Sequence, residues 1–221
     1  MLHAKDENGC LIKDKRLVVA TTHILYNPKR GDCKLAQMQM ILANIDKLAY
    51  KKSKVTSENK MIPAYYPTIF CGDLNCISQS KMYEFVHKSK LTNYKELNRY
   101  LISGQIQTSR SCLKIEKTLL PDELGISDQS QFKSEVDKRL AELAEHTPNK
   151  DAYCSFGGSH LRHTFNFKSV YEYVNESQQL EVTSCIQDTK KWLILYFSIQ
   201  KSVTIMTTVT NRCLMKQLRR V

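Results

Sequence analysis

A carboxylate and a carboxamide stand two residues apart directly after an apolar stretch. The stretch reads "TIFC", and Gly72, Asp73, Leu74 and Asn75 follow it. Because residues two apart in an extended chain face the same way, Asp73 and Asn75 can project together. A carboxylate can hold a hard cation or activate water, and an amide can donate to a phosphoryl oxygen. Gly72 leaves room for a ligand to approach the backbone.

His23 is the second candidate for chemistry. It follows an apolar run at residues 17–20 and a pair of threonines. Sites in α/β proteins are built where strands end, so we predict that His23, Asp73 and Asn75 lie at the ends of neighbouring strands in one pocket. Structural roles stay open for all three, because Gly-Asp-x-Asn is also common turn chemistry and a single histidine is often structural.

The elements that must position these residues alternate between strand and helix. The stretches 17–20 and 68–75 predict two buried strands. Residues 32–52 predict a helix, with Asp32 as N-cap and apolar side chains at three-four spacing. A second helix is predicted from residue 81, with Ser80 as N-cap, and residues 55–67 are predicted to be a linker. This order predicts an α/β fold.

The pattern weakens beyond residue 92. Residues 103–111 predict a loop. Residues 127–149 are polar with a weak helical period, so we expect them outside the core as a partly mobile insertion. Residues 160–174 read as ordered again, and residues 180–185 predict a strand. The β-branched and aromatic stretch 192–210 favours further strands.

The composition is that of a globular but basic protein. Of 221 residues, 42% are hydrophobic and 25% charged, and 33 Lys and Arg against 22 Asp and Glu give a net charge of +11. This excess favours polyanionic partners such as nucleic acid, phosphorylated ligands or anionic membrane surfaces. The alternative is that the lysines are scattered over a solvated surface.

Cysteine spacing and hydropathy exclude some classes. The eight cysteines contain no C-x-x-C pair, so zinc-ribbon spacing is absent. We expect a reduced, intracellular protein, cytoplasmic with the nucleus as the alternative, because the N-terminus does not read as a signal peptide. No apolar stretch of about 20 residues occurs, so we expect no membrane partner.

Two long motifs carry a family resemblance. "TTHILYNPKRGDCKLAQMQMILANI" and "FCGDLNCISQSKMYEFV" resemble the Thr-His and Gly-Asp-Phe-Asn motifs of the endonuclease/exonuclease/phosphatase (DNase I-like) superfamily, although Ile77 and Gln79 depart from it. Within it the chain looks most like the Angel proteins, relatives of nocturnin and the cytoplasmic deadenylases. The resemblance covers roughly residues 15–185. It implies a two-sheet α/β sandwich flanked by helices, here incomplete: a partial domain at 1–185, an insertion near 104–160 and an unmatched tail at 186–221.

The resemblance also implies roles for single residues. Asp73 matches the aspartate that activates the attacking water, and Asn75 matches the asparagine that holds the nucleophile and phosphoryl oxygens. His23 matches the histidine that contacts the phosphate. The candidate substrate contacts are Asn27, which stands where the related deadenylases often carry an aspartate, and Lys29 and Arg30, which are placed to approach a nucleic-acid backbone, with a solvent-facing role as the equal alternative for the two basic residues. Mg²⁺ is the implied cofactor; its main ligand is a glutamate expected upstream of this chain, so the metal ligands stay unknown, with Asp73 as one candidate.

Two functions follow from the resemblance. The first is a Mg²⁺-dependent RNA phosphohydrolase, either a 3′-exonuclease of the deadenylase type or a 2′,3′-cyclic phosphatase, acting at an mRNA 3′ end or 3′-untranslated region. We expect its activity to be impaired in this chain, because the family's upstream glutamate and its final Ser-Asp-His do not occur in it. The second is a non-catalytic RNA- or protein-binding remnant. The oligomeric state is left open.

Overall fold

The computed structural model describes residues 1–57, 61–104, 114–115, 117–143, 154–169, 184–186, 189–191 and 196–198. The strands are β1 (Leu2–Lys5), β2 (Leu11–His23), β3 (Tyr50–Val55), β4 (Met61–Tyr65), β5 (Thr68–Asp73), β6 (Lys90–Leu91), β7 (Leu161–Arg162), β8 (Lys168–Ser169), β9 (Ser184–Ile186), β10 (Thr189–Lys191) and β11 (Tyr196–Ser198). The helices are α1 (Gly31–Ala49), α2 (Lys81–Lys88), α3 (Arg99–Ser103) and α4 (Lys133–Ala141), with short 3₁₀ turns at Tyr94–Glu96 and Asp122–Leu124.

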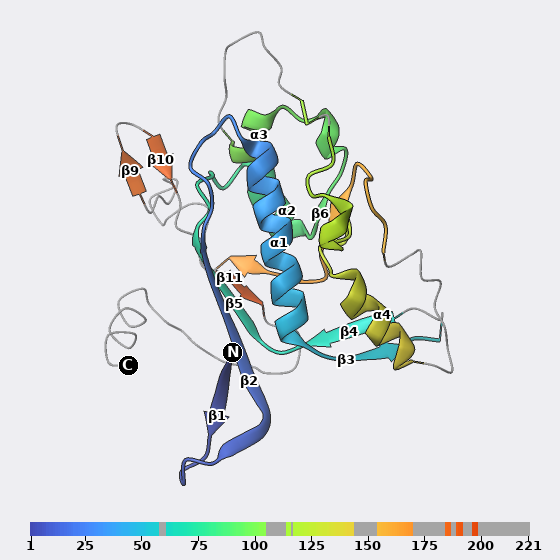
Figure 1. Ribbon diagram of the computed structural model, residues 1–221. Coiled ribbons are helices and arrows are strands. Elements are labelled where there is room, and N and C mark those ends of the chain that lie inside the picture. The colour runs from blue at the N-terminus through green and yellow to red at the C-terminus, as the bar shows by residue number, and fades with distance from the viewer. Residues whose placement is uncertain are drawn as a thin grey trace.

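A five-stranded sheet in the order β1-β2-β5-β11-β8 forms the centre of the fold (Figure 1). The two predicted strands, β2 and β5, are parallel neighbours, with Val18 opposite Thr68 and His23 opposite Asp73. The other pairings in this sheet are antiparallel. The α/β fold class is therefore confirmed. β2 begins at Leu11, earlier than the apolar run predicts, because its first half pairs with β1.

α1 lies across the sheet and supplies much of the core (Figure 1). Leu35, Met38 and Leu42 are fully buried, as the spacing predicts. The predicted N-cap and the predicted C-terminal end of this helix are wrong. Arg30 is the N-cap and Asp32 sits in the first turn, where its carboxylate pairs with the Arg30 guanidinium at 3.1 Å. The helix ends at Ala49, and the lysines that follow belong to β3.

α2 confirms its predicted start. The Ser80 hydroxyl accepts the Tyr83 N–H at 3.1 Å, which satisfies one of the free amides of the first turn. Met82, Phe85 and Val86 are buried and pack into the same core as α1.

The predicted linker at 55–67 is wrong. β3 and β4 pair as an antiparallel hairpin, with Lys54 opposite Ile62 and Ser53 opposite Pro63. A proline is tolerated here because the sheet has only two strands, so one side of β4 needs no ladder bond. The hairpin delivers Tyr65 and Tyr66 into the core, which gives it an apolar anchor that its lysines conceal in the sequence.

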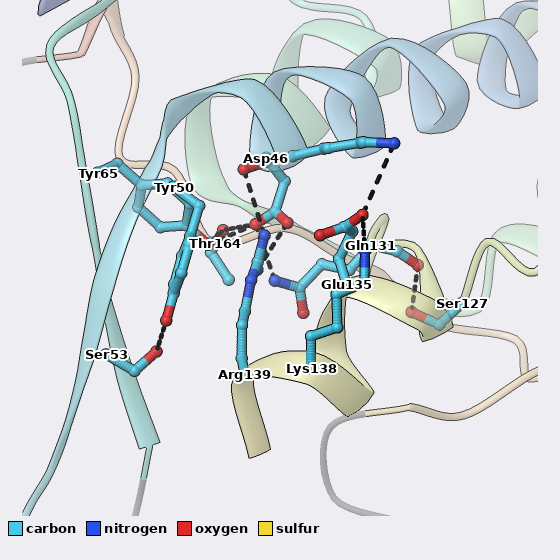
Figure 2. A network of polar contacts seen from close by, with 11 residues as sticks. Asp46, Tyr50, Ser53, Tyr65, Ser127, Gln131, Glu135, Lys138, Arg139 and Thr164 are labelled. Atoms are coloured by element: carbon cyan, nitrogen blue, oxygen red, sulfur yellow. Dashed lines mark hydrogen bonds and ion pairs between the residues drawn. The ribbon is translucent and has the colours of Figure 1, made fainter. Parts of the chain in front are cut away.

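The expectation that residues 127–149 lie outside the core is also wrong for the part that the structure describes, whereas their being an insertion stays a prediction. α4 forms, and Ser127, Gln131, Val136 and Arg139 are buried. The segment is polar because it buries polar groups around Asp46 of α1 rather than an apolar stripe (Figure 2). Residues 144–149 lie outside the described residues.

Three further predictions can be placed in part. β11 confirms a strand within 192–210, and it joins the central sheet beside β5. Only Ser184–Ile186 of the strand expected at 180–185 is described, and most of the predicted loop at 103–111 lies outside the described residues. Within the described part of the chain, no helix is long and apolar enough to cross a membrane. Among the described residues, Cys10, Cys33, Cys71, Cys76 and Cys154 form no disulfide.

Candidate active site

His23 and Asp73 are the last residues of two parallel neighbouring strands. They face each other in register, and His23 Nε2 lies 3.6 Å from Asp73 Oδ2. Their side chains are 74% and 36% exposed, so both are open to a ligand. Parallel strands end at the same sheet edge, which is why two motifs about fifty residues apart in sequence meet here. The predicted placement of this pair at neighbouring strand ends is therefore confirmed.

Asn75 lies behind this pair and connects the two strand ends. Its φ is +45°, in the left-handed region that asparagine tolerates better than most residues. Its backbone N–H donates to Asp73 Oδ1 at 2.8 Å, and its side-chain Nδ2 donates to the Ile24 carbonyl at 2.8 Å. The turn interpretation of Gly-Asp-x-Asn thus holds locally, and the same turn fixes the Asp73 carboxylate at the sheet edge.

Gly72 is required because the neighbouring strand comes close to it. The expectation that it leaves room for a ligand to approach the backbone is therefore corrected. Its φ is +139°, and a Cβ at this position would lie 2.0 Å from the Thr22 carbonyl oxygen. Only a residue without a side chain lets β2 and β5 approach this closely beside His23 and Asp73.

Gly72→Ala is therefore expected to lower the free energy of unfolding by about 2 kcal/mol or more, since both the backbone angle and the contact are unfavourable. Urea unfolding of the two proteins measures this difference. Gly125→Ala is the matched control: its φ is +63°, but a Cβ there meets nothing within 4 Å. Equal losses for the two variants would show that backbone angle alone matters and that the Thr22 contact does not.

Two side chains of α1 hold the loops that follow the strands. Lys34 is fully buried, and its Nζ donates to the Asn75 carbonyl at 2.8 Å. Gln37 Oε1 accepts the Leu25 N–H at 3.0 Å. Neither Lys34 nor Gln37 was predicted from the sequence to have this role. The signal for Lys34 is a lysine directly before the buried Leu35, on a helix face that is otherwise mostly apolar.

Cys76 lies in the same turn but is unsuited to act as a nucleophile. The thiol is 2% exposed, and burial raises its pKa to about 11, although a hydrogen bond with Ser80 and the charge of Lys34 act in the opposite direction. At neutral pH the thiol stays protonated and packs as a core residue.

The predicted substrate contacts lie in the loop between β2 and α1. Asn27 organises this loop: its side-chain oxygen accepts the Lys29 N–H at 3.0 Å, and its carbonyl accepts the Arg30 N–H at 3.2 Å. The Arg30 guanidinium bonds Asp32, which raises the arginine pKa. Lys29 is exposed. Asn27, Lys29 and Arg30 therefore share the loop that begins directly after His23, and their roles toward a substrate stay predictions.

The described residues offer little to a metal ion. No three His, Cys, Asp or Glu side chains come together in the described part of the chain. Mg²⁺ prefers about six oxygen ligands, commonly one or two carboxylates completed by phosphate and water. Asp73 Oδ2 fits one such position, and the described residues do not complete the set.

Known proteins resemble this chain over most of its length. No protein-family model matches it. Protein angel homolog 2 of Mus musculus is 34% identical over 181 residues, which cover 76% of this chain and 31% of that protein. Protein angel homolog 1 of Rattus norvegicus is 39% identical over 118 residues, 52% of this chain and 16% of the relative. The crystal structure of ANGEL2, described as a 2′,3′-cyclic phosphatase and solved with adenosine-2′,3′-vanadate, matches with a TM-score of 0.60 and 31% identity over 82% of this chain and 45% of its own.

Three findings define an α/β domain of the DNase I-like kind, the endonuclease/exonuclease/phosphatase superfamily. They are the paired strand ends, the hydrogen bond from Lys34 of α1 to the turn after β5, and the structural match. Within that superfamily the chain belongs with the Angel proteins. The chain spans about a third of the length of the angel homolog 2 relatives that it matches.

Proposed function

We propose that this chain carries part of the active site of an Angel-type phosphohydrolase that acts on RNA ends, with a terminal 2′,3′-cyclic phosphate as the first candidate substrate. The observation that carries the proposal is the exposed carboxylate–imidazole pair, 3.6 Å apart at the ends of two parallel strands. The similarity to a solved 2′,3′-cyclic phosphatase supports the choice of substrate.

Each residue has a role that its geometry allows. The Asp73 side chain is partly exposed and its Oδ1 accepts the Asn75 N–H, so the carboxylate is held in an orientation in which it can accept a proton from an attacking water. His23, more exposed still, can donate to a phosphoryl oxygen and stabilise charge in the transition state. Asn75 and Lys34 hold the turn that carries Asp73.

Mg²⁺ is proposed as the cofactor on the family resemblance. Asp73 would be one of its ligands, and substrate phosphate and water would contribute others. When bound, such an ion neutralises charge on phosphoryl oxygens. RNA as the partner, its 3′ end as the reacting position and a cytoplasmic location are likewise proposals.

A different activity, and a role without catalysis, also have support. The resemblance to the cytoplasmic deadenylases keeps 3′-exonuclease activity as a second candidate, and carbon catabolite repressor protein 4 homolog 6 of Arabidopsis thaliana is 38% identical over 91 residues, 41% of this chain. The net charge of +11 also suits RNA binding without turnover, which stays the alternative function.

Two proteins test these proposals together. The first is the 221-residue chain, which we expect to turn over cyclic-phosphate RNA and oligo(A) poorly, because losing one transition-state contact costs about 10²–10³ in rate. The second is mouse angel homolog 2 with its matched segment replaced by this chain's residues. We expect that chimera to hydrolyse the cyclic phosphate with Mg²⁺ but not with EDTA.

Asp73→Ala is then expected to lower turnover by the chimera about 10²-fold and, because it removes the acceptor of the Asn75 N–H, to lower its free energy of unfolding by about 1 kcal/mol. Asp122→Ala, an exposed carboxylate in a 3₁₀ turn, is the control and is expected to retain full turnover. Asp73→Ala activity equal to that of the parent chimera would remove Asp73 from the proposed chemistry. Turnover of oligo(A) alone would favour the second candidate.

A further inference from the structure

Two cations from different strands rest on one buried aromatic ring at the far end of the sheet. The guanidinium of Arg16, from β2, lies 5.2 Å from the centre of the Tyr66 ring, and the Lys51 ammonium, from β3, lies 5.4 Å from it. Tyr66 is only 7% exposed, and its N–H donates to the Ala49 carbonyl at 2.7 Å. The ring is therefore a fixed support that two like charges contact.

Two more exposed lysines follow Lys51 on β3. Lys52 and Lys54 are two residues apart on a strand, so their side chains leave the same face about 7 Å apart. Among the described residues, no carboxylate lies within ion-pair distance of Arg16, Lys51, Lys52 or Lys54. We call these four residues the β2–β3 basic cluster.

Four lysines on the helices have carboxylate partners close by. Lys81 and Lys88 both pair with Glu84 of α2, and Lys138 pairs with Glu135 of α4, as does Lys47. These helix lysines are thus paired, whereas the described residues offer the β2–β3 basic cluster no carboxylate partner, in a chain whose net charge is +11. Unpaired like charges in one place attract an anion that can contact several of them at once.

The cluster lies at the opposite end of the sheet from the candidate active site. Tyr66 precedes β5, and Asp73 ends it, so up to about 23 Å of extended chain separates them at ~3.3 Å per residue. Figure 1 shows the β1–β2 and β3–β4 hairpins projecting from the end of the fold away from the loop that joins β2 to α1. A ligand that reaches both places must be a polymer.

We propose that the β2–β3 basic cluster binds the phosphate backbone of single-stranded RNA whose 3′ end occupies the candidate active site. A regularly charged, flexible strand matches charges that are spaced along β3, and it can span the distance to Asp73. The cluster supplies affinity without sequence preference, since its contacts are to phosphate. This inference rests on the RNA substrate proposed above and extends it to a second contact surface.

The test measures binding of a fluorescein-labelled RNA of about 12 nucleotides to the 221-residue chain by anisotropy, as salt concentration is varied. The variant carries Arg16→Gln, Lys51→Gln, Lys52→Gln and Lys54→Gln. We expect at least tenfold weaker binding at about 50 mM salt and a log–log salt slope reduced by roughly 3, since each contact to a single strand contributes about 0.7. A dinucleotide, too short to reach the cluster, is expected to bind both proteins equally.

A control with the same charge change separates this cluster from net charge. Lys90, Lys114, Lys117 and Lys133 are exposed lysines without an ion pair among the described residues, and their four Gln substitutions are expected to change RNA affinity less than threefold. The double variant Lys52→Gln with Lys54→Gln leaves the Tyr66 contacts intact, so it does not disturb the core around that ring. It is expected to show half the loss in salt slope of the fourfold variant, which separates lost phosphate contacts from misfolding. Equal losses in cluster and control variants would overturn the proposal.

Two other outcomes are decisive. Cluster-dependent binding to phosphatidylserine vesicles without binding to RNA would overturn the RNA assignment in favour of a membrane surface. Cluster-dependent RNA binding in a chimera that turns over no phosphoester would uphold this inference while removing the proposed function, because binding is measured independently of turnover.

Discussion

Arg139→Met is expected to lower the free energy of unfolding by about 3–5 kcal/mol, because it leaves a buried carboxylate without its counter-ion. Arg139 Nη1 lies 2.7 Å from Asp46 Oδ2, and the two side chains are 3% and 1% exposed. The guanidinium also stacks 4.0 Å over the ring of Tyr50. Methionine keeps much of the volume and none of the charge, so the loss reports the unpaired carboxylate.

Asp46 is the centre of a network that connects four parts of the chain (Figure 2). Its Oδ1 accepts the Tyr65 hydroxyl, the Gln131 Nε2 at 2.8 Å and the Thr164 hydroxyl at 3.3 Å. These residues come from α1, β4, the start of the α4 segment and the loop after β7. Losing the Arg139 charge beside Asp46 therefore disturbs the contacts among all four parts of the chain at once.

Two controls make the result specific. Lys138→Met, one residue before Arg139, removes an exposed pair with Glu135 and is expected to cost under about 1 kcal/mol. The double variant Asp46→Asn with Arg139→Met is expected to be less destabilised than the sum of the two single variants, since neither charge is then left alone. A cost below 1 kcal/mol for Arg139→Met, measured by urea unfolding, would show that the pair contributes nothing beyond its packing.

The same network explains which parts of the fold could be predicted. β2, β5, α1 and α2 follow from apolar periodicity because most of the side chains that they bury are apolar. The α4 segment is held by a buried ion pair and amide contacts, which periodicity cannot detect, so its polar composition wrongly predicted an exposed insertion. The β3–β4 hairpin was missed for a related reason: its strands are lysine-rich, and the two tyrosines that anchor it come at its end.

The candidate site was predictable to the extent that it depends on strand order. His23 and Asp73 each follow an apolar run, and parallel pairing then places them side by side. The left-handed turn at Asn75 and its support by Lys34 depend on contacts between β5 and α1, which no local pattern contains.

The second large effect concerns acid stability and His163. This imidazole is buried against Phe85 and Phe167, and burial lowers its pKa to about 4, although contacts with the backbone of Phe85 and Val86 act in the opposite direction. Its Nδ1 accepts the Phe165 N–H at 3.2 Å, so Nε2 carries the proton and donates to the Phe85 carbonyl at 3.1 Å. The folded protein therefore holds the neutral ring.

The sign of the pH effect follows from this difference. Above pH 6.5 the ring is neutral in both folded and unfolded chains, and the stability that depends on it is fully present. As pH falls from 6.5 toward 4, the unfolded chain binds a proton that the folded chain refuses. At about 1.4 kcal/mol per pH unit, the free energy of unfolding then drops by roughly 3 kcal/mol across this window.

His163→Gln removes the titration and retains an amide that can donate to the Phe85 carbonyl, so its stability at pH 7 falls but its slope between pH 6.5 and 4 flattens. His3→Gln, in the exposed strand β1, is the control and is expected to keep the parent slope. Urea unfolding at half-unit pH steps gives the free energy of unfolding of each protein as a function of pH. Other groups titrate in the same range, so the result is the difference in slope between each variant and the parent. A His163→Gln slope equal to that of the parent would mean that the buried ring takes up its proton in the folded state as readily as in the unfolded chain.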